Sequence, residues 1–116
     1  MSGIVFLGTK DLDGMKEFYT REVGMEVWLE QAECFILKHG NLLLGFCKRE
    51  EPDLQGIVTI FYETNEEVDR MYPKFGDTAE GIPKVNERYR IYHFFARDPE
   101  GRRLEFQRFL HDLPDL

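Results

Sequence analysis

One carboxylate stands out in the C-terminal part of the chain, because its neighbours on both sides are apolar. Glu105 lies in Leu-Glu-Phe at 104–106, shortly after the sequence Asp-Pro-Glu-Gly at 98–101. Pro at the second position and Gly at the fourth are typical of a type I turn between two strands. A carboxylate in the middle of an apolar strand must be solvated, paired or placed in a cavity. Glu105 is therefore the first candidate for binding or acid–base chemistry.

The start of the chain carries a second pattern. Residues 11–19 read Asp-Leu-Asp-Gly-Met-Lys-Glu-Phe-Tyr, and Val-Gly-Met follows at 23–25. Taken with the turn at 98–101 and the strand containing Glu105, this order resembles the vicinal oxygen chelate superfamily. That superfamily includes glyoxalase I, extradiol dioxygenases, fosfomycin-resistance enzymes and bleomycin-resistance proteins. The resemblance covers essentially the whole chain, and since one scaffold carries unrelated chemistries, the activity depends on the residues at the site.

Length and composition define the class of protein. The chain has 116 residues, of which 42% are hydrophobic, enough for one ordinary globular core. A net charge of -7 argues against nucleic acid as a partner. No segment approaches the roughly 20 apolar residues of a membrane helix, and no signal peptide is visible. We expect a cytoplasmic protein without a membrane partner, in which Cys34 and Cys47 are free thiols.

The spacing of apolar residues predicts the same order of elements twice. The first half is predicted to contain a strand at 3–9, a helix from Asp11 to about Glu22, a strand at 26–30, and a hairpin of 33–38 with 41–48 about His39-Gly40. After a polar linker at 49–55, the second half is predicted to contain a strand at 57–63, a helix capped by Asn65 and ended near Pro73, a weak strand at 82–86, and a hairpin of 89–97 with 102–109. The sequence therefore predicts an α+β fold of two tandem βαβββ modules in one domain, 1–116, with modules at about 1–50 and 56–110.

The resemblance implies that the two curled mixed sheets surround a cavity and that metalloenzymes of the superfamily place metal ligands on the first and fourth strand of each module. By counting, these positions are Ile4, Leu44, Thr59 and Glu105. Only Glu105 is a suitable ligand for a catalytic divalent metal, and the adjacent residues at 3, 5, 43, 45, 58 and 60 cannot ligate either. We expect no metal and no other cofactor.

Alternation of side chains along strands predicts the lining of the cavity. With Trp28 added as an aromatic stacking surface, the candidate ligand-binding residues are Trp28, Phe46, Thr59, Phe61, Tyr92, Phe94, Glu105 and Gln107. An apolar wall with a few polar points suits a small organic ligand. The same reasoning pairs His93 with Phe106, facing away from Glu105. It also places Cys34 and Cys47 diagonally on the helix-packed face, too distant for a disulfide.

Three functions remain open. The first resembles the metal-free bleomycin-resistance branch: a homodimer that sequesters an aromatic or cationic small molecule in its cavity, with Glu105 as an anchor. The second is a metal-independent lyase or isomerase-type enzyme with Glu105 as general base. The third is a structural or regulatory dimer with a filled cavity. The rival interpretation of Glu105 itself is a carboxylate held by Arg103 in a structural pair. We expect a homodimer because open curled sheets leave apolar faces and edges uncovered.

Overall fold

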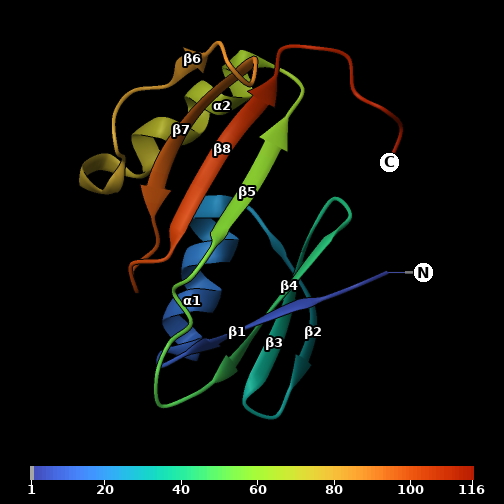
Figure 1. Ribbon diagram of the computed structural model, residues 1–116. Coiled ribbons are helices and arrows are strands. Elements are labelled where there is room, and N and C mark those ends of the chain that lie inside the picture. The colour runs from blue at the N-terminus through green and yellow to red at the C-terminus, as the bar shows by residue number, and fades with distance from the viewer. Residues whose placement is uncertain (1) are drawn as a thin grey trace. The chain divides into compact units, whose positions relative to one another are not determined.

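The chain consists of two successive runs of strand, helix and three strands, and the computed structural model describes residues 2–116 (Figure 1). The first run comprises β1 (Val5–Thr9), α1 (Leu12–Phe18), β2 (Glu26–Gln31), β3 (Cys34–His39) and β4 (Leu42–Lys48). The second comprises β5 (Ile57–Tyr62), α2 (Asn65–Met71), β6 (Lys84–Asn86), β7 (Ile91–Arg97) and β8 (Arg103–Phe109). The predicted class, α+β with two tandem βαβββ modules, is confirmed.

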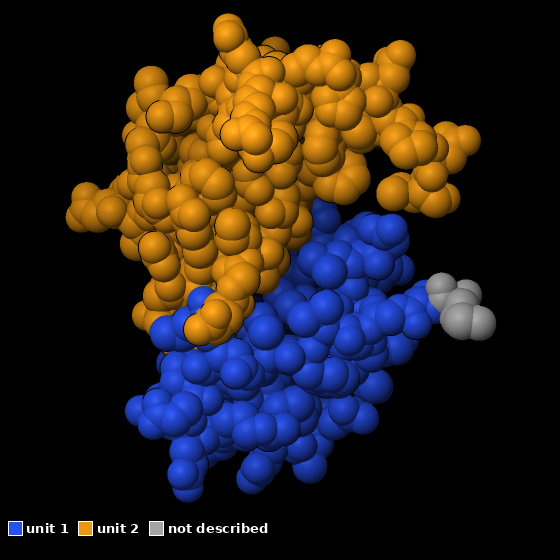
Figure 2. All heavy atoms as spheres, in the orientation of Figure 1, with its two compact units in different colours: residues 1–54 blue, residues 55–116 orange. Residues whose placement is uncertain are grey.

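Each module forms its own compact unit, residues 1–54 and 55–116, shown in different colours in Figure 2. The strand order is β1-β4-β3-β2 in the first sheet and β5-β8-β7-β6 in the second. In each sheet the first strand pairs in parallel with the last, and the remaining pairs are antiparallel. The last strand of each module therefore has a partner on both sides. Among the described residues, no helix is long and apolar enough to cross a membrane.

The first helix begins where the sequence predicts. Asp11 is the N-cap, and its Oδ1 accepts a hydrogen bond of 3.0 Å from the Gly14 amide. After α1 the chain continues as a π-helical turn, Tyr19–Val23, which ends at Gly24 with a φ of 87°. Tyr19 is fully buried and packs on Phe46 of β4 with ring centroids 5.0 Å apart. These contacts define one face of the first sheet as the helix-packed face.

The second helix begins one residue earlier than predicted. Thr64, and not Asn65, is the N-cap, and its Oγ1 accepts from the Glu67 amide at 3.2 Å. Thr64 has the extended backbone that a cap needs, with φ −132° and ψ 153°. Pro73 acts as predicted, since α2 ends at Met71 and a 3₁₀ turn over Tyr72–Lys74 follows.

An aromatic core fills the helix-packed face of the second sheet. Phe94 of β7 and Phe106 of β8 are stacked with centroids 5.3 Å apart, and Phe75 packs on Phe106 at 4.9 Å. Val68 and Met71 of α2 are buried as well, and α2 contacts β5, β7 and β8. We call the opposite side of this sheet the open face.

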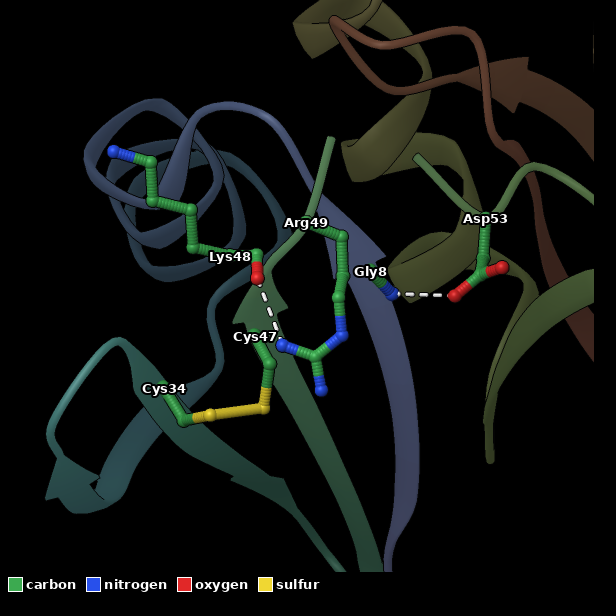
Figure 3. The surroundings of a disulfide bond; sticks show 6 residues. All are labelled: Gly8, Cys34, Cys47, Lys48, Arg49 and Asp53. Carbon is green, nitrogen blue, oxygen red and sulfur yellow. Dashed lines mark hydrogen bonds between the residues drawn. A yellow bond between two sulfur atoms is a disulfide. The ribbon is translucent and has the colours of Figure 1, made fainter. Parts of the chain in front are cut away.

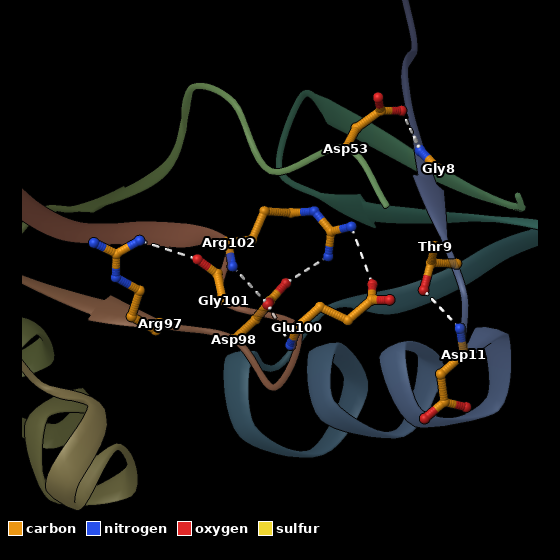
Figure 4. Close-up of polar contacts among 9 residues, drawn as sticks. All are labelled: Gly8, Thr9, Asp11, Asp53, Arg97, Asp98, Glu100, Gly101 and Arg102. Atoms are coloured by element: carbon orange, nitrogen blue, oxygen red, sulfur yellow. Dashed lines mark hydrogen bonds and ion pairs between the residues drawn. The ribbon is translucent and has the colours of Figure 1, made fainter. Parts of the chain in front are cut away.

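The last hairpin has a register that differs by one residue from the prediction. The amide of Gly101 donates to the Asp98 carbonyl, which is the expected turn, but the Asp98 amide then bonds the Arg102 carbonyl. Gly101 has a φ of 97° and acts as a bulge, so that Arg97 pairs with Arg103. Figure 4 shows the Asp98 carboxylate holding this loop, with 2.9 Å bonds from the amides at 100 and 102. A shift of one residue moves every side chain of one strand to the other face.

The first hairpin also differs from its prediction. Its two-residue turn is Gly40-Asn41 and not His39-Gly40, since His39 pairs with Leu42. Cys34 then lies directly opposite Cys47 with a Cα–Cα distance of 4.1 Å, and the two form a disulfide (Figure 3). The prediction of two free, diagonal thiols was wrong because the turn lies one residue further along the chain. Both sulfurs belong to the face opposite Phe46, because alternate residues of β4 point to opposite sides.

Candidate functional site

A cluster of polar side chains lies on the open face of the second module. β5 and β8 pair in register, so Thr59 is opposite Glu105. β7 and β8 place His93 directly opposite Gln107 and Phe95 opposite Glu105. Strand alternation puts all five side chains on one face, away from the aromatic core.

Glu105 is the centre of this cluster and is only 8% exposed. Its Oε1 accepts hydrogen bonds from Thr59 Oγ1 at 2.9 Å and from Gln107 Nε2 at 3.0 Å. Its Oε2 lies 2.7 Å from His93 Nδ1. The prediction that His93 faces away from Glu105 was wrong, because it depended on the shifted register. Glu105, the expected anchor, is therefore already hydrogen-bonded within the protein. Its partners are a hydroxyl, an amide and an imidazole.

Arg103 is not the partner of Glu105. It pairs with Glu80, with Nη2 3.1 Å from Oε1, and its guanidinium lies 3.8 Å from the centroid of the Phe95 ring. The His93 ring contacts the same Phe95 ring edge-on at 5.1 Å. Phe95 is thus fixed from two sides beside the polar cluster.

Two polar atoms of the cluster, Gln107 Oε1 and His93 Nε2, have no hydrogen-bond partner among residues 2–116. Gln107 is 8% exposed, and its Oε1 is fully buried without a hydrogen-bond partner among residues 2–116. A carboxylate can only accept, so the Gln107 amide nitrogen must face Glu105 and its oxygen must face away. His93 uses Nδ1 toward Glu105, which leaves Nε2 on the other side of the ring.

The open face contains a pocket of about 380 Å³ beside this cluster. It is lined by Asn86, Tyr89, Ile91, His93, Phe95, Glu105, Gln107 and Phe109. Aromatic and aliphatic side chains form most of the wall, and the His93–Glu105–Gln107 group supplies the polar part. This combination is typical of a site for a small organic molecule.

The structure separates the predicted residues of this module. Thr59, Glu105 and Gln107 come together as expected. Tyr92 and Phe94 do not, because the one-residue shift puts them on the helix-packed face. There Phe94 belongs to the aromatic core, and the Tyr92 hydroxyl donates to Asp69 of α2.

The predicted Phe61 is 41% exposed and packs edge-on against Phe109, beside the pocket but outside its lining. His93, Phe95 and Phe109 were missed. The Gly at 101, a known bulge position after a type I turn, was the signal that could have found them.

In the first module, the predicted Phe46 is not on the open side. It is fully buried between Tyr19 and Phe35 on the helix-packed face, and Leu44 shares that face. The prediction located the cavity-facing residues of β4 by counting four residues on from Gly40, in the way that Glu105 lies four residues after Gly101. The two hairpin loops differ in length, so the count selects the wrong face. Trp28 is 51% exposed next to a β-bulge in β2 and lines another pocket, of about 390 Å³, with Ile4, Lys38 and Leu43 among its neighbours.

The positions at which the sequence resemblance implies metal ligands do not fit a metal ion in this chain. The open-side residues of β4 are Leu43, Gly45 and Cys47. Leu43, Gly45 and Ile4 cannot ligate, and the Cys47 sulfur is bonded to Cys34. In the second module both oxygens of Glu105 are engaged by Thr59, His93 and Gln107. Across the described part of the chain, no group of three or more His, Cys, Asp or Glu side chains is arranged to hold a metal.

Two tyrosines on the α2 side of the second module have altered acidity. The hydrogen bond to the Asp69 carboxylate, with smaller effects of burial and neighbouring charge, raises the pKa of Tyr92 to about 12. Burial, assisted by the charge of Glu67, raises the pKa of Tyr62 to about 12. Both hydroxyls stay protonated at neutral pH and act as donors rather than bases.

Solved structures show the same fold. A glyoxalase/bleomycin resistance protein/dioxygenase family enzyme from Burkholderia phytofirmans has a TM-score of 0.80 at 21% identity, over 92% of this chain and 97% of that one. TioX from a Micromonospora species has a TM-score of 0.77 at 20% identity, over 95% and 99%. Lactoylglutathione lyase from Agrobacterium tumefaciens has a TM-score of 0.75 at 20% identity, over 93% and 92%. No protein-family model and no curated protein matches the sequence.

Proposed function

The chain has the fold of the glyoxalase/bleomycin resistance/dioxygenase proteins, and we propose that it is a metal-independent binding protein that sequesters a small aromatic or cationic molecule. One observation carries the proposal: an aromatic pocket on the open face of the second module contains a buried, fully hydrogen-bonded carboxylate at its edge. The aromatic side chains of the wall favour a ligand with a flat ring. The Glu105 carboxylate and the net charge of -7 on the chain favour a ligand with a positive charge.

Metal independence is part of the proposal. Its support is the chemistry of the residues at the positions counted for the metal ligands, where Ile4, Leu44 and Thr59 offer no imidazole or carboxylate. The two neighbours of Leu44 on the open side, Leu43 and Gly45, offer none either. A catalytic site of this type needs two or more such ligands with one or two open positions.

The enzyme alternative with Glu105 as general base has less support. Thr59, His93 and Gln107 occupy the oxygens that would have to accept a proton from a substrate. The alternative of a filled cavity conflicts with a pocket of about 380 Å³ within the second module.

We also propose a homodimer and a cytoplasmic location. Support for the dimer comes from large apolar side chains that remain exposed in each module, Ile4, Phe6 and Trp28 in the first and Ile57 and Phe61 in the second. Light scattering at micromolar concentration tests the dimer, and a monomer contradicts it. Cell fractionation tests the compartment, for which the Cys34–Cys47 disulfide is the opposing observation.

A thermal-shift screen with cationic aromatic compounds, carried out in excess EDTA, tests the binding function. A molecule that binds only the folded state must raise the melting temperature. A parallel screen without EDTA and with added Zn²⁺ or Ni²⁺ should not increase the effect. The shift should be lost in Phe95→Ala, which removes a pocket wall, and retained in Phe18→Ala, a matched change on α1. Shifts that appear only with added metal would contradict metal independence.

A further inference from the structure

The pocket of the first module lies on the side of its sheet opposite the helix-packed face. It has a volume of about 390 Å³ and shares no lining residue with the pocket of the second module. The sheet order is β1-β4-β3-β2, and four of the lining residues form a row across it. These are Ile4 directly before β1, Leu43 of β4, Lys38 of β3 and Trp28 of β2.

The strand register brings these side chains together. Lys38 and Leu43 are direct cross-strand partners in the β3–β4 hairpin. Val5 pairs with Leu44, so Ile4 lies beside Leu43 where the parallel β1–β4 pair begins. Because neighbouring strands are about 4.8 Å apart, the row from β1 to β2 spans roughly 14 Å at the level of the backbone. This leaves room for one aromatic ring between the side chains at its two ends.

Trp28 owes its place at one end of the row to a β-bulge. Val27 pairs with Leu37 and Leu29 with Ile36, so Trp28 is the extra residue and has no partner on β3. It is 51% exposed, and its side chain makes no ring contact or hydrogen bond with residues 2–116. The indole therefore offers a flat apolar surface to a molecule in the pocket.

Lys38 is the one charged residue among the described residues that line this pocket. Its side chain is exposed and forms no ion pair or hydrogen bond with residues 2–116, although Glu26 lies opposite it on β2. An ammonium group has three donor hydrogens and no acceptor, and its flexible four-carbon stem lets it follow a bound anion. The cation is thus accessible from the pocket, and a ligand need not displace an existing partner.

We infer that this pocket binds an aromatic molecule that carries a single carboxylate group. The ring lies between Trp28 and Leu43, and the carboxylate accepts hydrogen bonds from the Lys38 ammonium. One lysine matches one negative charge, whereas the net charge of -7 on the chain disfavours a dianion such as a phosphate monoester. The ligand is opposite in charge to the one proposed for the second module, so the two sites stand or fall separately.

The test uses Trp28 as the reporter, because it is the only tryptophan of the chain. The full ¹⁵N-labelled protein therefore gives one indole N–H signal, which is followed in titrations with benzoate, benzamide and benzamidine. These probes have nearly the same size and carry a negative charge, no charge and a positive charge. The solution has low salt and about pH 7, where an ordinary lysine is protonated.

Benzoate should move the indole signal in a saturable way and bind roughly fivefold more tightly than benzamide, the upper range for an ion pair exposed to solvent. Benzamidine should bind most weakly. The preference for benzoate over benzamide should shrink at high salt, because dissolved ions screen exposed charges.

Two variants locate the charge. Lys38→Met removes the ammonium but keeps an unbranched side chain, and it should reduce the affinity for benzoate to that for benzamide. Lys84→Met is the matched control, because Lys84 is an exposed lysine of β6 outside this pocket, and its loss changes the net charge equally. It should keep the preference. Both lysines are exposed, so neither change removes a core side chain.

Three results would overturn the inference. Equal binding of benzoate and benzamide rules out selection for a carboxylate. A preference that both variants lose rules out the role of Lys38, because net charge alone would explain it. An indole signal that no probe moves rules out the site, and if this signal also changes with protein concentration, a second copy of the chain covers the face. None of these results decides the function of the second-module pocket, which the cationic compounds and Phe95→Ala test.

Discussion

His93 Nδ1 and Glu105 Oε2 lie 2.7 Å apart across β7 and β8, in residues that are each 8% exposed. The two residues are diagonal neighbours on the open face, since Glu105 is opposite Phe95 and His93 is opposite Gln107. This contact makes Glu105 the centre of a hydrogen-bonded network with Thr59, His93 and Gln107. It also leaves the other nitrogen of the imidazole for the pocket.

Glu105→Gln should lower the stability of the protein. The variant presents an NH₂ group to donors that now bond both carboxylate oxygens, so at least one buried group loses its partner. A loss of about 1–3 kcal/mol in the free energy of unfolding is expected, measured by urea denaturation. Glu87→Gln is the control, because Glu87 is an exposed carboxylate of the same module and should change stability by less than about 0.5 kcal/mol. A neutral or stabilising Glu105→Gln would mean that the network is not formed in solution.

Phe106→Ala should destabilise the second module strongly. Phe106 is fully buried between Phe94 and Phe75, and its removal leaves a cavity in an aromatic core. The expected cost is about 3–5 kcal/mol, measured by thermal or urea unfolding. Phe61→Ala removes the same group from a side chain that is 41% exposed and should cost much less. Similar losses in both variants would contradict the assignment of the two faces.

Reduction of the Cys34–Cys47 bond should lower stability by about 2–4 kcal/mol, because the cross-link constrains the unfolded chain. Urea unfolding with and without a reductant measures the difference. The double variant Cys34→Ala/Cys47→Ala should match the reduced protein and respond no further to the reductant. Detection of two free thiols per chain in protein purified without reductant would show that the bond is not formed.

Tyr92→Phe should remove a contribution to stability that depends on pH. The Tyr92 pKa is raised to about 12 in the folded protein by its bond to Asp69. A raised pKa means that the contribution is fully present below the pKa of a free tyrosine, about 10, and is lost as the pH rises toward the folded value. The difference in unfolding free energy between the natural chain and Tyr92→Phe should therefore be constant at neutral pH and shrink at alkaline pH.

The control for this pH series is Tyr89→Phe. The Tyr89 side chain is 60% exposed, and its hydroxyl forms no hydrogen bond with the described residues. Its difference from the natural chain should stay flat over the same range. A flat profile for Tyr92→Phe as well would contradict the bond to Asp69.

Local sequence signals predicted the elements and their order. Asp11 caps its helix, Gly24 ends the turn that follows, and Pro73 stops α2, because each acts on backbone groups within a few residues of itself. Apolar spacing placed most of the strands, and the repeated order gave the two βαβββ modules. Thr59, Glu105 and Gln107 could be grouped from alternation along the parallel β5–β8 pair alone.

The tertiary structure decided which side chains share the site. The loop between β7 and β8 contains Gly101 as one extra residue, and this shifts the pairing of the two strands by one. His93 and Phe95, and not Tyr92 and Phe94, therefore share the face of Glu105. In the first hairpin a turn moved by one position brought Cys34 opposite Cys47. The physical reason is the same in both modules: a strand's own sequence determines which residues alternate, but hydrogen bonding to its neighbour determines the register, and with it the partners on each face.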